Sequence, residues 1–208
     1  MKRLIKTIVL IIGIISLLCT QSCLSQDKKQ QYPSQISEKA KVLRNLYSKA
    51  EIDNQYQKQF FEAFPASFSL FCQLYGYDEK GKLNILYEES LPHIRLFCGL
   101  DDIVDKEKYY KKLISLGING HWQADAVNYL QHWTLKKVKE NLPLTIATLE
   151  NYSDEEIKSF WYFLFDGHHP SETIPIDISK VRNTSNHIAD LAKEAFLKVH
   201  KNAEPHGQ

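Results

Sequence analysis

The sequence has little net charge, few residues that break regular structure, and no apolar run long enough to span a membrane permanently. Its 26 basic and 25 acidic side chains leave a net charge of +1, so it lacks the basic field of most nucleic-acid-binding domains. Only 8 glycines and 7 prolines in 208 residues exclude collagen-like and low-complexity chains. With 43% hydrophobic and 25% charged residues, the composition is that of an ordinary folded protein.

Common catalytic motifs are missing as well. The sequence contains no HExxH, no CxxC, no Gly-x-Ser-x-Gly and no phosphate-cradling glycine-rich loop. Acidic pairs such as Glu88–Glu89 cannot be told apart from a solvated acidic run. We therefore expect no catalytic residue, no cofactor, no metal centre and no nucleic-acid partner.

The first residues have the pattern of an export signal. Lys2, Arg3 and Lys6 are followed by an apolar run of twelve residues, Ile8–Cys19. A helix needs about twenty residues to span a bilayer, so this run is too short for a permanent anchor, and its length suits the core of a signal peptide. A buried helix of the fold is the alternative, but the basic start at the N-terminus favours the signal peptide.

The segment that follows resembles the lipobox of bacterial lipoproteins. It reads Thr20–Cys23 (TQSC), with the small Ser22 before the cysteine and Thr20 where the motif usually has leucine. The resemblance implies that the sulfur of Cys23 receives a lipid and that the chain is cut before it. The protein is then a lipid-anchored membrane protein of the bacterial cell envelope, facing the periplasm. Acyl chains anchor stably when two or more are present.

The remaining sequence is helical in pattern. Apolar residues recur at steps of three and four, the spacing of one helix face. The segments predicted to be helical are 35–64, 66–75, 91–100, 105–116, 122–141, 153–165 and 185–200. Ser153 and Glu156 form a capping-box pattern, Pro143 reads as a helix stop, and 174–178 reads as a short extended piece. The run from Phe160 to Phe165 is apolar all round, which predicts a central helix.

The fold class that follows is all-α. We expect a single-domain helical bundle of about six or seven helices, with a minor strand at most. The expected regions are a lipoprotein signal peptide at 1–22, a lipidated cysteine with a flexible tether at 23–34, a helical domain at 35–200 and a disordered tail at 201–208.

Two cysteines fall inside the helical domain. Cys72 and Cys98 can form a disulfide in an oxidising periplasm, closing a loop of about 26 residues that is worth roughly 3 kcal/mol. They can equally be two buried free thiols, because free cysteine is among the most buried residue types. The sequence leaves both alternatives open.

A histidine-rich cluster has two interpretations. Asp166, His168 and His169 stand at a helix end, where histidine interacts well with the helix dipole. His121 and Asp125 are four apart, as metal ligands on one helix face are, although Gly120 can place His121 at the helix start. A structural role is favoured, and the alternative is a periplasmic hydrolase or metal-dependent enzyme that uses this cluster.

The stretch 121–129 (HWQADAVNY) is unusual for pure packing, because Gln123, Asp125 and Asn128 lie among large apolar residues. Such groups are either internal hydrogen-bonding residues or part of a recognition surface. We expect the partner surface near two turns, at 74–78 and at 167–170. The candidate partner-binding residues are Tyr75, Tyr77, Asp78, His121, Trp122, Asp125, Asp166, His168 and His169.

Three segments resemble motifs of helical immunity proteins, which are carried beside antibacterial toxins of contact-dependent systems such as type VI secretion. They are 68–77 (FSLFCQLYGY), 121–129 (HWQADAVNY) and 159–170 (SFWYFLFDGHHP), so the resemblance covers roughly residues 60 to 172. It implies a protein that binds and blocks a cognate toxin without catalysis, and an export signal implies that the toxin acts in the periplasm. A structural envelope lipoprotein without a toxin partner is a further alternative.

Overall fold

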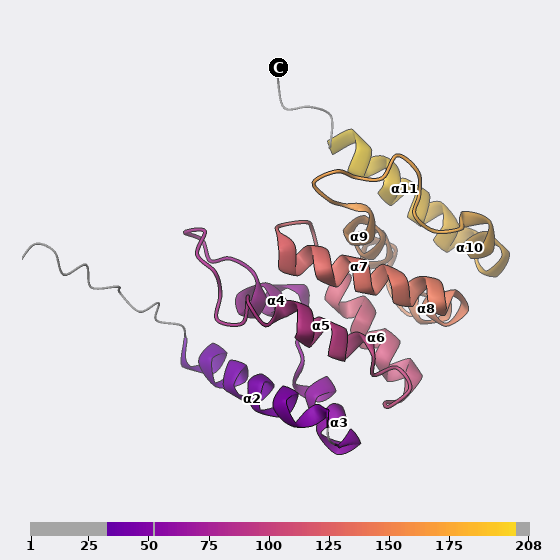
Figure 1. Ribbon diagram of the computed structural model, residues 1–208. Coiled ribbons are helices and arrows are strands. Elements are labelled where there is room, and N and C mark those ends of the chain that lie inside the picture. Colours follow the sequence, from indigo (N-terminus) through magenta and orange to yellow (C-terminus); the bar gives the residue numbers. More distant parts are fainter. Residues whose placement is uncertain (1–32, 52, 203–208) are drawn as a thin grey trace, which may run out of the picture. The chain divides into compact units, whose positions relative to one another are not determined.

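A computed structural model describes residues 33–51 and 53–202 of the protein, and these fold as helices (Figure 1). Within this part there are ten helices and no strand, so the expectation of an all-α fold is confirmed. The only extended pairing described there is an isolated antiparallel bridge between Tyr77 and Leu83. The helices are α2 (Ser34–Ala50), α3 (Asn54–Ala63), α4 (Phe68–Tyr75), α5 (Ser90–Cys98), α6 (Lys106–Gly117), α7 (Asp125–Glu140), α8 (Leu142–Leu149), α9 (Asp154–Phe165), α10 (Ile178–Thr184) and α11 (Asn186–Asn202).

The helix count exceeds the expected six or seven because capping side chains divide the chain more finely than apolar spacing does. Asp53 accepts a hydrogen bond from the backbone N–H of Gln55, which starts α3 and splits the stretch predicted as one helix over 35–64. Asn141 caps α8 in the same way, with Pro143 in the first turn of that helix. As predicted, a helix ends before Pro143, because α7 ends at Glu140. The sequence reasoning did not foresee α8, which holds this proline in its first turn, where proline is tolerated because the backbone N–H groups there have no partner within the helix.

The extended piece predicted at 174–178 is also corrected. Residues 174–177 have no regular structure, and the Asp177 carboxylate accepts backbone N–H groups of Ser179 and Lys180 to start α10. The last helix, α11, begins at Asn186 and runs through Lys201 to Asn202, so these two residues of the expected tail are helical. Residues 203–208 lie outside the described part.

Other predicted helix starts match the structure. Ser67 caps α4 and Asp105 caps α6 through their side-chain oxygens. The capping box of Ser153 and Glu156 is present at α9, with both reciprocal hydrogen bonds formed. Local polar signals of this kind therefore fix helix boundaries that apolar spacing leaves open.

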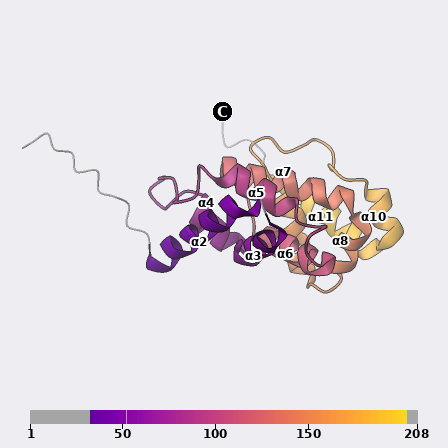
Figure 2. The ribbon, with the colours of Figure 1, turned by 60° about the horizontal axis from the view of Figure 1, so that its bottom comes forward.

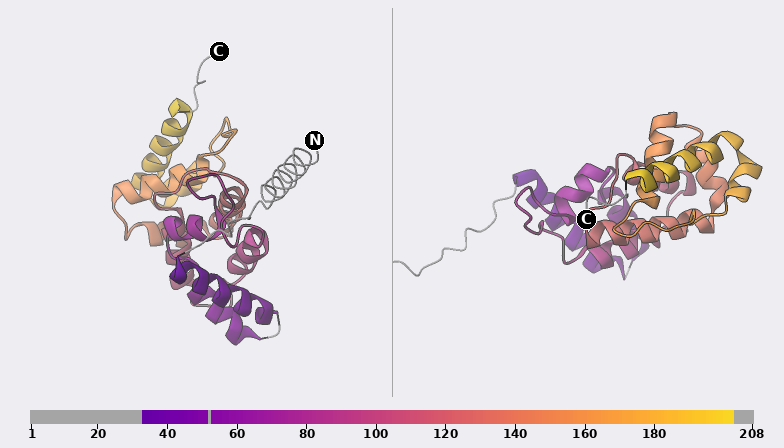
Figure 3. Two further views of the ribbon diagram at one scale, coloured as in Figure 1. Left: turned by 90° about the vertical axis from the view of Figure 1, so that its left-hand side faces the viewer. Right: turned by 90° about the horizontal axis from the view of Figure 1, so that it is seen from above.

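The helix predicted to be central, α9, packs against α6, α7 and α11 (Figure 1). Figures 2 and 3 show α10 and α11 on one side of the central helices and the α2–α3 pair on the other. The buried side chains of α9 are Ile157, Phe160, Trp161, Phe163, Leu164 and Phe165. All ten helices belong to one compact unit.

A second group of rings lies between α3, α4, α5 and α6, and we call it the aromatic core. Its members are Phe60, Phe61, Phe64, Tyr75, Phe97 and Tyr109, each fully buried or nearly so. The rings of Phe64 and Phe97 stack with centroids 4.4 Å apart, and Phe61 and Phe97 stack at 5.8 Å. His93 joins this group from α5 and meets the ring of Phe60 edge-on.

The predictions about export and anchoring concern residues that the structure does not describe. The signal peptide at 1–22 and the lipidation site at Cys23 both lie outside the described residues. Among the helices that are described, none is long and apolar enough to cross a membrane.

Candidate functional site

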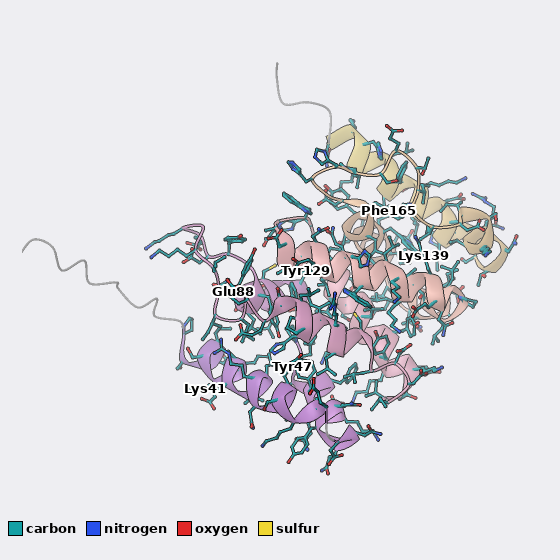
Figure 4. The ribbon with its side chains drawn as sticks, in the orientation of Figure 1. Lys41, Tyr47, Glu88, Tyr129, Lys139 and Phe165 are labelled. Atoms are coloured by element: carbon teal, nitrogen blue, oxygen red, sulfur yellow. The ribbon has the colours of Figure 1, made fainter. Side chains whose placement is uncertain are left out.

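A partly open pocket of about 380 Å³ lies where the start of α7, the end of α9 and the loop 166–175 meet. We call it the α7–α9 pocket. It is lined by Trp122, Ala124, Asp125, Asn128, Leu135, Leu164, Phe165, Asp166, Gly167, His168, His169, Pro170, Ser171 and Pro175. Phe165, labelled in Figure 4, contributes to the lining from the end of α9, and its ring meets Phe196 of α11 edge-on at 5.9 Å.

Two glycines bring the chain before α7 against α9. A Cβ atom on Gly117 would lie 2.7 Å from Phe160, and one on Gly120 would lie 2.5 Å from Phe163. Between them, Asn119 has a φ of 60°, and its backbone N–H donates to Ser159 Oγ at 2.7 Å. Only residues without a side chain allow this close approach, which delivers the following segment to the end of α9.

Asp166 then ties that segment to the end of α9. Its Oδ2 accepts the backbone N–H of Trp122 at 2.6 Å, and its Oδ1 accepts the N–H of Gly167 at 3.0 Å. From α7, the buried Gln131 donates through Nε2 to the carbonyl oxygens of Phe163 and Asp166. Four hydrogen bonds therefore hold the segments around the pocket together. Three of them join residues distant in sequence, and the fourth is local, between Gly167 and Asp166.

The aromatic wall of the pocket consists of Trp122 and two histidines. The ring of His168 stacks on that of Trp122, with centroids 5.4 Å apart and an angle of 27° between the planes. His169 meets His168 edge-on at 4.4 Å. Both imidazoles are exposed and Trp122 is half-buried, so this wall faces the solvent.

A chain of hydroxyl groups connects the pocket with the loop before α5. The hydroxyl of Tyr77 donates to that of Tyr87 at 3.0 Å, and Tyr87 donates to Oδ2 of Asp125 at 3.0 Å. The hydrogen bond with Tyr77, burial, and the nearby Asp125 carboxylate all raise the pKa of Tyr87. Tyr77 is 39% exposed, so the chain reaches the protein surface.

The structure brings together five of the residues selected from the sequence. Trp122, Asp125, Asp166, His168 and His169 all line the α7–α9 pocket. They come from two segments about 40 positions apart in the chain, and the Asp166 carboxylate is the group that joins the segments.

Tyr75, Asp78 and His121 do not line the pocket. Tyr75 is fully buried, and its hydroxyl shares a hydrogen bond of 2.9 Å with Nδ1 of His93. Asp78 shapes its own turn by accepting the backbone N–H groups of Lys80 and Lys82. His121 packs against Phe68, with ring centroids 5.2 Å apart.

Of the two positions considered for His121, the one on a helix face shared with Asp125 is not found. Helix α7 begins at Asp125, with Ala124 as its N-cap, so His121 precedes the helix. Gln123, Asp125 and Asn128 are exposed, and the internal hydrogen bonds expected of them are made by Gln131. Among residues 33–51 and 53–202, no group of three or more His, Cys, Asp and Glu side chains is placed to hold a metal ion.

Sequence reasoning missed Tyr87 and Gln131. Tyr87 lies outside the helices, in a segment without a periodic pattern, and it reaches Asp125 across 38 positions. Gln131 lies on the buried face of α7, and that unusual position for an amide is the one signal that marks it.

The two cysteines of the helical domain, Cys72 and Cys98, are free thiols in the structure. Cys98 is buried and Cys72 is half-buried. Burial raises the pKa of each thiol to about 12. Because the thiolate is the reactive form, neither side chain is suited to act as a nucleophile.

Comparison of the chain with protein-family models, with curated proteins and with solved structures found no match. The geometry of the α7–α9 pocket is therefore the basis for a functional proposal. The pocket combines two carboxylates, an indole and two imidazoles at a surface, and hydrogen bonds from the backbone to Asp166 join the two segments that carry them.

Proposed function

We propose that this protein is a lipid-anchored binding protein of the bacterial cell envelope that binds and neutralises a cognate antibacterial toxin acting in the periplasm. The observation that carries the proposal is the α7–α9 pocket, whose lining combines exposed aromatic and acidic side chains from two distant segments. The likeness of the same segments to helical immunity proteins supplies the class of partner.

The lining is better suited to recognition than to bond cleavage. The Asp166 carboxylate holds backbone N–H groups of Trp122 and Gly167, so both of its oxygens already have a structural task. Asp125 is held by Tyr87 at the mouth of the pocket. Covalent catalysis usually needs a nucleophile hydrogen-bonded to a base. Ser171 is the one hydroxyl among the described lining residues, and its Oγ accepts the backbone N–H of Thr173 and forms no hydrogen bond with His168 or His169.

The surroundings of the pocket have the composition of a protein interface. Tyrosine and tryptophan are enriched at interface centres, where they fill or form pockets surrounded by a polar rim. Here Tyr77 and Tyr87 extend the aromatic surface from Trp122 toward the loop before α5. A pocket of about 380 Å³ accommodates one or two large side chains of a partner.

Co-expression with the protein encoded beside this one tests the proposed function. A toxin directed to the periplasm should stop growth, and co-expression of the wild-type protein should restore growth and yield a complex that co-purifies. Absence of both complex and rescue would remove the proposal. An envelope defect after deletion in a strain without the toxin would instead favour a structural lipoprotein.

The anchor has a separate test. We expect the wild-type protein in the membrane fraction, with an intact mass that begins at a lipidated Cys23. The Cys23→Ser variant should leave the membrane fraction while the helical domain keeps its thermal unfolding transition. An unprocessed N-terminus, or unchanged membrane association of the variant, contradicts the anchor.

A further inference from the structure

The α7–α9 pocket is acidic. Among the described residues that line it, Asp125 and Asp166 have carboxylates, and none is a lysine or an arginine. Asp125 stands in the first turn of α7, where the helix dipole favours a negative charge. The charge of the pocket therefore selects a cationic group as its occupant.

Both carboxylates have acceptor capacity left. Asp125 accepts the Tyr87 hydroxyl through Oδ2, and within the described part of the chain its Oδ1 accepts no hydrogen bond. Each oxygen of Asp166 accepts one backbone N–H, although a carboxylate oxygen has two lone pairs. A ligand with several N–H donors can therefore use oxygens that the fold already holds in place.

The aromatic wall of the pocket favours a guanidinium group over an ammonium group as the cation. Trp122 and His168 form a stacked pair of flat rings beside the carboxylates. A guanidinium group is planar, stacks on aromatic faces and has five N–H donors that match a carboxylate pairwise, whereas an ammonium group is a compact point charge. Apolar lining from Leu135, Leu164 and Phe165 suits the aliphatic part of such a side chain.

We propose that the α7–α9 pocket receives an arginine side chain of the partner protein, whose guanidinium packs against the Trp122–His168 wall and pairs with Asp125 and Asp166. This inference rests on the proposed function, because it names the chemistry by which the toxin is recognised. The hydroxyl chain from Tyr77 to Asp125 orients the carboxylate that the guanidinium meets.

A direct binding experiment uses the intact protein in detergent micelles, labelled with 5-fluorotryptophan. The three tryptophans give three fluorine resonances, and the Trp122→Phe variant assigns that of Trp122. Titration with N-acetyl-arginine methylamide should shift the Trp122 resonance. The uncharged, equally shaped N-acetyl-citrulline methylamide should need at least a tenfold higher concentration for the same shift, and equal shifts from both probes would overturn the proposal.

The charge requirement has its own matched variants. Asp125→Asn keeps an oxygen for the Tyr87 hydroxyl but removes the charge, and should weaken arginine-probe and toxin binding at least tenfold. Glu172→Gln removes an equal charge within the loop 166–175 without changing a lining residue, and should change binding less than twofold. Equal effects of the two variants would mean that only net charge matters, and would overturn the proposal.

The results separate this inference from the proposed function. Toxin binding at wild-type affinity by Asp125→Asn overturns the arginine proposal and leaves the immunity function standing. If the arginine probe binds specifically but co-expression yields no toxin partner, the result supports the pocket chemistry and counts against the immunity function. A shift of the Trp122 resonance by N-acetylglucosamine, with none by the arginine probe, replaces the arginine proposal with a carbohydrate site.

Discussion

Two histidines, each beside aromatic rings, have opposite environments in this molecule. His93 is 1% exposed and lies among Tyr47, Phe60 and Tyr75. Figure 4 labels Tyr47 on α2, and its ring centroid is 4.7 Å from that of His93. His168 is exposed and stacks on Trp122 at the α7–α9 pocket.

The two sites differ in what holds the rings. In the aromatic core, the rings pack against one another, and their polar groups are satisfied inside the fold. Tyr75 shares a hydrogen bond with His93, and the Tyr109 hydroxyl donates to the carbonyl oxygen of Cys98. At the pocket, the ring of Trp122 is positioned by a backbone N–H that donates to the Asp166 carboxylate. The same residue types therefore stabilise the fold at one site, while at the other they stay available to a ligand.

The largest expected effect comes from the aromatic core. Phe97→Ala removes a fully buried ring that stacks on Phe64 and Phe61, and should lower the free energy of unfolding by about 3–5 kcal/mol. Trp122→Ala should cost about 1 kcal/mol, because its ring is half-buried. Urea denaturation followed by circular dichroism measures both. Similar losses for the two variants would break the distinction between core rings and pocket rings.

A pH series sharpens the comparison at His93. Burial lowers the pKa of His93 from 6.5 to about 4, against a smaller opposing effect of Glu89. The unfolded chain therefore takes up a proton before the folded protein does. The contribution of the neutral His93 side chain to stability is therefore complete above pH 6.5. About 3 kcal/mol of this stability should be lost as the pH falls from about 6.5 to about 4.

The variant His93→Gln provides the control for this series, because glutamine keeps an acceptor for the Tyr75 hydroxyl and does not titrate. Its free energy of unfolding should decline less than that of the wild type over the same pH range. The difference between the two curves removes the contribution of the other ionisable groups. Parallel curves would show that His93 is accessible to protons in the folded protein.

Local signals predicted much of the fold. Apolar spacing indicated most of the helices, and the Ser153–Glu156 capping box marked the start of α9 correctly. The same local reasoning missed α8 and was wrong at residues 174–178, because Asn141 and Asp177 cap helices that apolar spacing alone does not reveal. A cap acts through one or two hydrogen bonds, so it can start a helix within a segment that has no clear apolar stripe.

The site was predictable as a set of residues but not as a shape. Trp122 and Asp125 stood out because polar residues lie among large apolar ones in 121–129, and His168 stood out because it follows a predicted helix end. Their convergence depends on the Trp122–Asp166 hydrogen bond, which spans 44 positions, and no periodic pattern encodes such a contact. Tyr75 and Tyr77 looked alike in sequence, yet the end of α4 between them buries one and exposes the other.

A smaller loss of stability is expected from a substitution at Gly120, in the segment that leads from α6 to α7. Gly120→Ala places a methyl group within 2.5 Å of the Phe163 ring, and overpacking of this kind should cost about 1–3 kcal/mol. Gly81→Ala is the matched variant: no atom lies within 4 Å of the added carbon, and its φ of +71° leaves only a backbone cost of about 1 kcal/mol. Thermal unfolding compares the two. A Gly120→Ala protein as stable as the wild type would show that this segment does not pack tightly on α9.

A substitution of Asp166 should have the smallest effect on stability, although it should change the position of the Trp122 ring in the pocket. Asp166→Asn keeps one oxygen acceptor but turns an N–H donor toward the backbone N–H of either Trp122 or Gly167. Because Asp166 is half-buried and water can replace the lost bond, the free energy of unfolding should fall by only about 1 kcal/mol.

The Trp122 ring should nevertheless lose its fixed position in the Asp166→Asn variant, since the carboxylate is the group that holds the Trp122 backbone to the end of α9. The fluorine resonance of Trp122 should then broaden or move, whereas those of the other two tryptophans stay in place. Asp190→Asn, which removes an exposed carboxylate paired with Arg182 on α10, is the control for loss of charge. An unchanged Trp122 resonance in Asp166→Asn would mean that packing alone orients the pocket, and the difference between the two histidine sites would then lie in exposure and not in what holds the rings.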